Sequence, residues 1–250
     1  MRDIEDYAKK YLEEPCEIFQ VKYRRKKVLE EMKKYPHKTI LEIGVGMEPL
    51  FPYVDDYEKY IMVEPAEEFA ENAKRLIEKT DSKEKVVCIQ GFFEACVEQI
   101  KKMGISFEYI LVSGLLHEIE KPDDFMNGVK SLCGKNTVVH LNVPNARSIH
   151  RLVAKEMGLI ADEHEISDLQ KKMQRRICYD LDSLSSYVKQ VGFEVLDSGS
   201  YFPKVLAAGQ LEQMLKMNII SDKYFEGMDG IGKYFPENGS EIYVQLKRED

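Results

Sequence analysis

The chain has 250 residues, of which 44% are apolar, and a formal net charge of −8. This apolar content is enough for the core of one large domain, while the acidic excess argues against nucleic acid as a partner bound through its phosphates. The apolar runs are shorter than the roughly 20 residues of a membrane span, so we expect a cytoplasmic protein without a membrane partner. The five scattered cysteines form no Cys-x-x-Cys pair, and neither a disulfide framework nor a metal site is predicted.

Two helices are predicted in an N-terminal cap that spans residues 1–36. The first carries an apolar stripe that begins at Ile4 and ends before Pro15, and the second carries a stripe that ends at Met32. The second helix also contains a basic run from Arg24 to Lys27. We interpret this run as a solvated helix face.

From residue 38 onward, short β-type apolar runs alternate with helical patterns. This alternation is typical of βαβ units, whose strands form a parallel sheet with helices on both faces. We therefore predict an α/β domain over residues 37–250, with helical insertions at about 147–180 and 203–238 that cover the acceptor site. The predicted strands are 39–43, 60–63, 86–89, 109–112, 138–141, 193–196 and 241–246, and a further helix is expected over 181–191.

The sharpest local motif is a strand that runs directly into a glycine turn, Ile40-Leu41-Glu42-Ile43-Gly44-Val45-Gly46. Glycines at the carboxyl edge of a sheet let the backbone approach a ligand, and open α/β sheets bind nucleotides at this edge. Glu64 ends the next strand, where a carboxylate can accept hydrogen bonds from both ribose hydroxyls. Together these features predict a cofactor with a nucleoside, whereas each alone also fits an ordinary turn or a solvated carboxylate.

A dinucleotide site is disfavoured by Pro49, which stands where the Gly-x-Gly-x-x-Gly pattern needs its last glycine. The segment 41–46 instead resembles motif I of the class I S-adenosylmethionine-dependent methyltransferases, (Glu/Asp)-x-Gly-x-Gly-x-Gly. The loop 91–93 after the third strand and the segment 113–119 after the fourth resemble further motifs of that family. The resemblance implies a Rossmann-like, seven-stranded α/β sheet that is mostly parallel, with a reversed final hairpin and helices on both faces.

The resemblance also implies how the chain would bind S-adenosylmethionine and its product S-adenosylhomocysteine. Glu42 and Gly44 would hold the amino-acid end of the cofactor through water and backbone, with Gly46 in the same turn. The backbone of Ser113 and Gly114 would line the methionine side.

Two further residues would contact the nucleoside end of the cofactor in the resemblance. Glu64 would bind the ribose, and Phe92 would line the adenine, although a phenylalanine there equally fits core packing. Glu48 departs from the family pattern, because it occupies the position of the third glycine of motif I. Its carboxylate either alters how the methionine part is held or points to solvent.

Two further residues are predicted to act on the acceptor. Methyl transfer from a sulfonium is an in-line displacement, and a hydroxyl acceptor gains from a base within hydrogen-bond reach. His117 stands in the loop that faces the methyl group in the resemblance and is predicted as this base. Glu118 beside it is a weaker candidate for the base and is expected to face solvent. The alternative is a histidine that only packs or orients the substrate.

The loop after the fifth strand is predicted to bind the acceptor. Asn145 would hydrogen-bond a polar group, and Arg147 or Arg151 would hold a phosphate or carboxylate. The alternative is an Asn-capped turn before a surface helix.

The order of motifs from this loop onward also resembles a subgroup with which bacteria tailor cell-surface polysaccharides. The predicted function is methyl transfer to a small polar acceptor, with O-methylation of a sugar, a nucleotide-sugar or a phosphorylated precursor preferred. An N- or C-methyltransferase of another small metabolite, a non-catalytic S-adenosylmethionine-binding protein and an NAD(P)-dependent oxidoreductase are the alternatives. The oligomeric state is left open, with a homodimer as one option.

Overall fold

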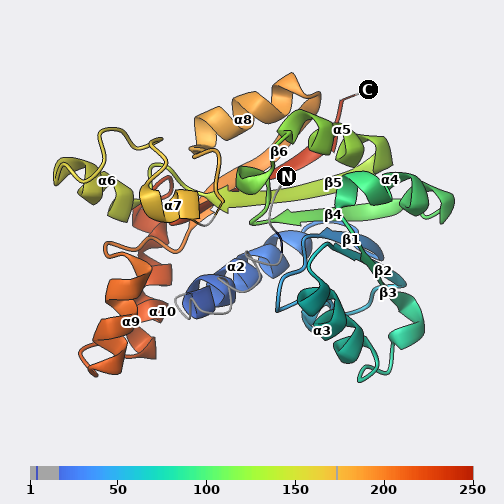
Figure 1. Ribbon diagram of the computed structural model, residues 1–250, viewed down its shortest axis with the longest axis horizontal. Helices are drawn as coiled ribbons and strands as arrows, with labels where there is room; N and C mark the ends of the chain where they lie inside the picture. The colour runs from blue at the N-terminus through green and yellow to red at the C-terminus, as the bar shows by residue number, and fades with distance from the viewer. Residues whose placement is uncertain (1–3, 5–16, 173, 250) are drawn as a thin grey trace.

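Seven strands form a single sheet in the order β3-β2-β1-β4-β5-β7-β6 (Figure 1). The computed structural model describes residue 4 and residues 17–172 and 174–249. Strands β1 to β5 run parallel, whereas β7 runs antiparallel to both of its neighbours. The strands are β1 (Thr39–Ile43), β2 (Lys59–Glu64), β3 (Val86–Gln90), β4 (Phe107–Ser113), β5 (Cys133–Pro144), β6 (Phe193–Tyr201) and β7 (Glu241–Arg248).

The predicted mostly parallel α/β sheet with a reversed final hairpin is confirmed, with β7 as the reversed strand of that hairpin, and each predicted strand is present. Two strands are longer than their apolar patterns indicate. The first residues of β5 are mostly exposed and polar, and the second half of β6 is a polar stretch on the edge of the sheet. Neither stretch is covered on both faces, so no continuous apolar run marks it.

Alternate residues of the parallel strands pack into two separate cores, one on each face of the sheet. Leu41 and Ile43 of β1 pack with α4, α5 and α8, whereas Ile40 packs with α2 and α3. Figure 1 shows these two layers of helices on opposite sides of the strands. The bounds are α2 (Glu17–Met32), α3 (Glu67–Ile77), α4 (Phe93–Lys102), α5 (Pro122–Leu132) and α8 (Leu181–Gln190).

The first insertion is less helical than predicted. Among the described residues of the insertion predicted at about 147–180, the helices are α6 (Ile149–Glu156) and the short α7 (Asp168–Lys172). The irregular segment between them is held by the buried Arg151, whose guanidinium donates to the carbonyl oxygens of Glu163 and Glu165. A side chain therefore satisfies backbone groups that a helix would otherwise pair internally.

The second insertion packs against the N-terminal helix. It contains α9 (Ala208–Lys216) and α10 (Asp222–Gly230), which lie beside α2 in Figure 1. Tyr23 stacks on Phe202 with ring centroids 4.2 Å apart, and Phe19 stacks on Phe225 at 3.9 Å. These aromatic pairs attach α2, which was predicted as part of a separate cap, to the end of the domain.

The remaining short elements are 3₁₀ turns, η1 (Phe51–Tyr53), η2 (Lys83–Lys85), η3 (Leu116–Glu118) and η4 (Ile231–Tyr234).

The helix predicted to begin at Ile4 lies outside the described residues, apart from Ile4 itself, which is buried. Within the part of the chain that the structure describes, no helix has both the length and the hydropathy of a membrane span.

The approach to β7 has no room for a side chain at Gly239. A Cβ on this glycine would lie 2.3 Å from both the backbone N and O of Tyr201 in β6, so β6 and β7 would have to separate. We expect Gly239→Ala to lower the free energy of unfolding by about 1–3 kcal/mol, as overpacking generally does, measured by urea denaturation. Gly227→Ala in α10 is the control, because no atom lies within 4 Å of the new Cβ. It should leave stability unchanged or raise it by up to about 1 kcal/mol, and equal losses in both variants would contradict the packing argument.

Candidate functional site

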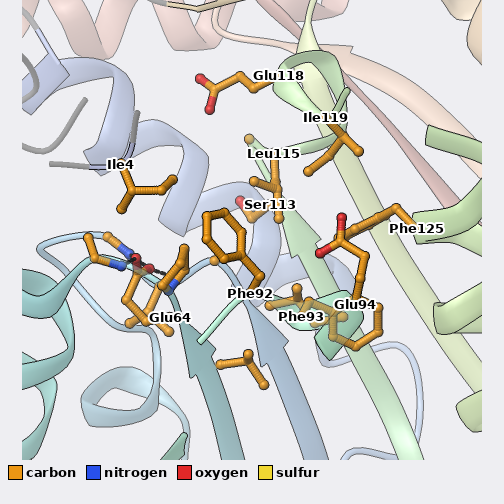
Figure 2. A pocket seen from close by; sticks show the side chains of 18 of the residues that line it. Ile4, Glu64, Phe92, Phe93, Glu94, Ser113, Leu115, Glu118, Ile119 and Phe125 are labelled. Atoms are coloured by element: carbon orange, nitrogen blue, oxygen red, sulfur yellow. Dashed lines mark hydrogen bonds between the residues drawn. The ribbon is translucent and has the colours of Figure 1, made fainter. Parts of the chain in front are cut away.

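A cavity of about 450 Å³ opens at the carboxyl ends of β1 to β4 (Figure 2). Its walls come from the turns that follow these strands, together with Arg24 of α2 and the first turns of α4 and α5. This is the edge at which open α/β sheets bind their ligands. Of the predicted site residues, Gly44, Gly46, Glu64, Phe92, Ser113 and Gly114 line the cavity, whereas Glu42, His117 and Asn145 do not.

The glycine turn after β1 requires glycine at its first position. Gly44 and Gly46 have φ angles of 77° and 61°, in the left-handed region where other side chains are strained. A Cβ on Gly44 would also lie 3.0 Å from Cδ2 of Leu115. The Gly44 amide donates to the carbonyl oxygen of Val63 at 2.9 Å, and this bond connects the turn to β2. The backbone of the turn lines the cavity.

Glu64, the last residue of β2, holds the glycine turn in place. Its Oε2 accepts hydrogen bonds from the amides of Val45 at 2.8 Å and Gly46 at 3.0 Å, as the dashed lines in Figure 2 indicate. Its Oε1 accepts from the Ala66 amide at 2.9 Å. The side chain is 4% exposed, so these bonds fix a buried carboxylate at the point where the ribose was predicted to lie.

Glu42 lies beneath the turn and outside the cavity lining. Its carboxylate accepts hydrogen bonds from the Leu50 amide at 3.2 Å and from the Tyr60 hydroxyl at 2.8 Å. Burial raises the pKa of Glu42 to about 7, and the charge of Glu64 acts in the same direction. The structure therefore places Glu42 as a support for the turn, and its predicted contact with the amino-acid end of the cofactor stays a prediction.

Glu48 points away from the cavity. It forms an ion pair with Arg25 of α2, and its side chain is 52% exposed. The Arg25 guanidinium also lies over the Tyr53 ring, 4.0 Å from the centroid. Glu48 was expected either to contact the methionine part of the cofactor or to point to solvent. Its side chain points outward, and its carboxylate pairs with Arg25.

The interpretation of the basic run on α2 as a solvated face is wrong at its beginning. The side chains of Arg24 and Arg25 are only about one-fifth exposed, and both form ion pairs with distant parts of the chain. Arg24 lines the cavity, which the sequence analysis missed.

The turns after β3 and β4 provide the other walls. Phe92 directly precedes α4 and is 42% exposed, and Figure 2 shows its ring in the middle of the cavity. A side chain with this exposure is not packed in the core, so the alternative given for Phe92 is excluded. Ser113 ends β4, and Gly114 follows with a φ of 63° and an amide that donates to the Asn142 carbonyl at 2.9 Å.

The two acid–base candidates after β4 lie in the reverse of the arrangement that was expected: Glu118 lines the cavity and His117 does not. His117 is 3% exposed and is not part of the cavity lining, and its carbonyl oxygen accepts from the amides of Arg176 and Ile177. Glu118, which was expected to face solvent, is 4% exposed and lines the cavity. Figure 2 shows it on the opposite side from Glu64. His117 Nε2 lies 3.5 Å from Glu118 Oε1, so the histidine contacts the acid that lines the cavity.

Asn145 joins the end of β5 to the segment before β7. Its Nδ2 donates to the carbonyl oxygens of Glu237 at 2.8 Å and Gly239 at 2.9 Å, and its Oδ1 accepts from the Arg147 amide at 2.9 Å. The side chain is 1% exposed. This is the geometry of the alternative, an Asn-capped turn, and the acceptor contact predicted for Asn145 stays a prediction.

A cluster with metal-ligand chemistry lies in the first insertion, away from the cavity lining. Asp162, Glu163 and His164 offer ligand atoms within 4.8 Å of one another. Lys155 already forms an ion pair with Glu163, and His164 Nε2 lies 3.3 Å from an oxygen of Asp180. These partners explain the cluster as surface ion pairing, and we assign it no metal.

The burial of Glu42 should make the stability of the fold depend on pH. A carboxyl with a pKa of about 7 in the folded state and about 4.5 in the unfolded state binds more protons when folded. Its contribution to the free energy of unfolding is therefore full below about pH 4.5 and is lost as the pH rises to about 7. This amounts to a change on the order of 3 kcal/mol.

We expect Glu42→Gln to remove this component, so that the difference in unfolding free energy between wild type and variant changes steadily between pH 4.5 and 7. Urea denaturation at several pH values measures it. Glu58→Gln, at an exposed position, should run parallel to wild type. A constant difference for Glu42→Gln would refute the argument from burial.

The chain can now be compared with known proteins. A family model described as a methyltransferase domain matches residues 19–198. The comparison with curated proteins finds no match. Among solved structures, the chain is similar to SpnF, a [4+2]-cyclase, with a TM-score of 0.62 and 12% identity over 90% of this chain and 80% of that one.

Two methyltransferases are similar to nearly the same extent. One is a SAM-dependent methyltransferase from Thermotoga maritima, with a TM-score of 0.58 and 14% identity over 94% of this chain and 91% of that one. The other is the glycopeptide N-methyltransferase MtfA in complex with S-adenosylmethionine, with a TM-score of 0.55 and 12% identity over 90% and 93%. At such identities the structures indicate a shared fold, whereas the family model covers most of the chain. The chain therefore belongs to the S-adenosylmethionine-dependent methyltransferases, with S-adenosylmethionine as its methyl donor.

Proposed function

We propose that the chain transfers the methyl group to a small polar acceptor that binds beside Glu118, on the β4 side of the cavity. The observation that carries this proposal is the buried Glu118 carboxylate in the cavity wall, across from Glu64. A carboxylate accepts hydrogen bonds from hydroxyl and amine groups alike, which are the nucleophiles that O- and N-methylation require.

The cavity has the features that the cofactor needs along the whole row of strand ends. The exposed Phe92 ring after β3 offers a face for the adenine, and Glu64 at the end of β2 offers carboxylate oxygens for the ribose. The glycine turn after β1 and Gly114 after β4 expose backbone where a side chain would intrude. In this order the methionine end lies between β1 and β4, next to the side on which Glu118 stands.

The bound cofactor supplies an electrophilic methyl group on a positively charged sulfur. The contribution of the chain is to align the acceptor atom with that methyl group and to receive its proton. Glu118 is the group in position to receive this proton, and His117 behind it orients the carboxylate through their contact at 3.5 Å. The base role predicted for His117 itself has less support, because His117 does not line the cavity.

Within this proposal, an uncharged sugar or an amine is a better acceptor than a phosphorylated precursor. Arg147 is exposed and Arg151 is buried in the first insertion, and neither lines the cavity. The phosphate ligands suggested by the sequence are thus elsewhere. The family model and the neighbouring structures do not support the resemblance to surface-polysaccharide enzymes.

Removal of the Glu64 carboxylate should weaken cofactor binding. Glu64→Ala loses the ribose contact and leaves the amides of the glycine turn without their acceptor. We expect the affinity for S-adenosylhomocysteine, measured by calorimetric titration, to fall at least tenfold, or about 1.4 kcal/mol. The exposed Glu68→Ala on α3 should bind like wild type, and an unchanged affinity in Glu64→Ala would place the ribose elsewhere.

The acceptor proposal is tested by incubating the protein and S-adenosylmethionine with each member of a panel of sugars, nucleotide-sugars, sugar phosphates and primary amines. The rate at which S-adenosylhomocysteine is released measures turnover. We expect turnover with an uncharged sugar or an amine. Glu118→Gln should reduce that turnover by a factor of about 10²–10⁴, the usual contribution of a proton acceptor, with an unchanged affinity for S-adenosylhomocysteine.

Glu98→Gln, at an exposed position on α4, is the matched control and should retain full turnover. Wild-type turnover in Glu118→Gln would remove Glu118 from the reaction. Binding of the cofactor without turnover of any panel member would count against a small polar acceptor.

A further inference from the structure

We propose that Arg24 binds the carboxylate of the methionine moiety of the cofactor, and that the buried Glu241 holds the guanidinium in the orientation needed for this contact. The proposal rests on cofactor binding in the cavity and is independent of the acceptor. It assigns a positioning role to a helix that the sequence analysis treated as a cap.

Arg24 reaches the cavity at the place where the methionine end is expected. Its side chain comes from α2 and lines the cavity beside Gly114. The guanidinium carbon, Nη1 and Nε would lie 3.5, 3.6 and 3.7 Å from a Cβ at Gly114. The absence of a side chain at Gly114 thus lets a guanidinium lie directly against the turn after β4.

Glu241, the first residue of β7, fixes the guanidinium from the side facing the protein interior. Arg24 Nε donates to both Glu241 oxygens at 3.0 Å, and Nη2 makes a further short contact with Oε1. An arginine has five donors in a planar fork, and these bonds use its Nε and Nη2 edge. The guanidinium group as a whole lies against the Gly114 turn, and Nη1 is the nitrogen that these bonds to Glu241 do not involve.

The carboxylate of Glu241 is itself held firmly. It is 2% exposed, and it accepts further hydrogen bonds from the Tyr201 hydroxyl and from Asn142 Nδ2, the latter at 3.1 Å. Burial alone would raise the pKa of Glu241, but the Arg24 guanidinium, together with the Tyr201 hydroxyl and the charge of Lys204, outweighs this effect and lowers it. The carbonyl of Asn142 accepts the Gly114 amide, so one network fixes both the arginine and the turn beside it.

The charges around the cavity explain why a cation is needed at this point. Among the described lining residues, only Arg24 and Lys121 are cationic, and Lys121 lies at the start of α5, 4.0 Å from Asp124. Glu64 and Glu118 line the same cavity. A ligand carboxylate between these acids is repelled unless a cation faces it, and a guanidinium matches a carboxylate in shape and charge.

The test uses two ligands that differ only in this carboxylate, S-adenosylmethionine and its decarboxylated analogue, each titrated calorimetrically. Replacement of Arg24 alone would leave Glu241 buried without its partner, so Arg24→Met is made in a Glu241→Gln background and compared with Glu241→Gln itself. We expect the affinity for S-adenosylmethionine to fall at least tenfold between these two variants. The affinity for the decarboxylated analogue should stay within twofold.

Arg25→Met is the matched control, because Arg25 is the next residue of the same helix and pairs with Glu48 outside the cavity. It should bind both ligands like wild type. An equal loss for both ligands in the Arg24 variant would show that Arg24 only attaches α2 to β7, and no loss for either would also overturn the proposal. If the double variant does not fold, Arg24→Lys is titrated with the same two ligands and compared with wild type. Lysine keeps the positive charge but lacks the planar guanidinium, so the same selective loss of affinity for S-adenosylmethionine is expected.

Binding by the wild type separates this proposal from the cofactor assignment. If the wild-type protein binds neither ligand, the cofactor site itself is misplaced and the Arg24 assignment fails with it. If the wild type binds both with equal affinity, the cofactor site is upheld and only the Arg24 proposal is refuted.

Discussion

The geometry of the site depends on one buried carboxylate, Glu64, and on the backbone amides that satisfy it. An acid removed from water at the end of β2 needs donors, and the glycine turn after β1 supplies two of them. That turn adopts its shape only because Gly44 and Gly46 tolerate left-handed backbone angles. The carboxylate therefore stabilises the shape of the turn, and the turn supplies the hydrogen bonds that allow the carboxylate to be buried. Both line the cavity at the edge of the sheet.

A second buried interaction connects the two ends of the described chain. Arg24 and Glu241 are separated by 217 positions, yet their ion pair holds Arg24, which lines the cavity. A pair of this kind is weak evidence for stability, because desolvation offsets much of the attraction. It is strong evidence for position, since a guanidinium held on one edge has few other orientations. Helix α2 thus contributes a residue to the cavity, and strand β7 supports that residue, although the motifs of the site all lie between these two elements.

The sequence predicted the sheet well because buried parallel strands are continuous apolar runs, and it predicted the cavity lining wherever a glycine or a strand end marked it. It failed where tertiary packing decides. Glu118 and His117 are neighbours in a 3₁₀ turn, and no periodicity indicates which of them faces the cavity. Arg24 offered a usable signal, because it stands one helical turn before the buried Val28. The basic residues that follow it obscured this periodicity.

The position of β7 has a consequence for how the protein is made. It is the last strand of the described residues, but it lies between β5 and β6 in the sheet. On the ribosome, strands β1 to β5 and their helices emerge first and can form a native parallel sheet. Strand β6 then emerges with no partner to pair with, and it has to wait for some 40 further residues until β7 arrives and bridges it to β5. We therefore expect the Arg24–Glu241 pair beside the cavity to form only after β7 has joined the sheet, and the unpaired edge of β5 to be the part most exposed to aggregation until then.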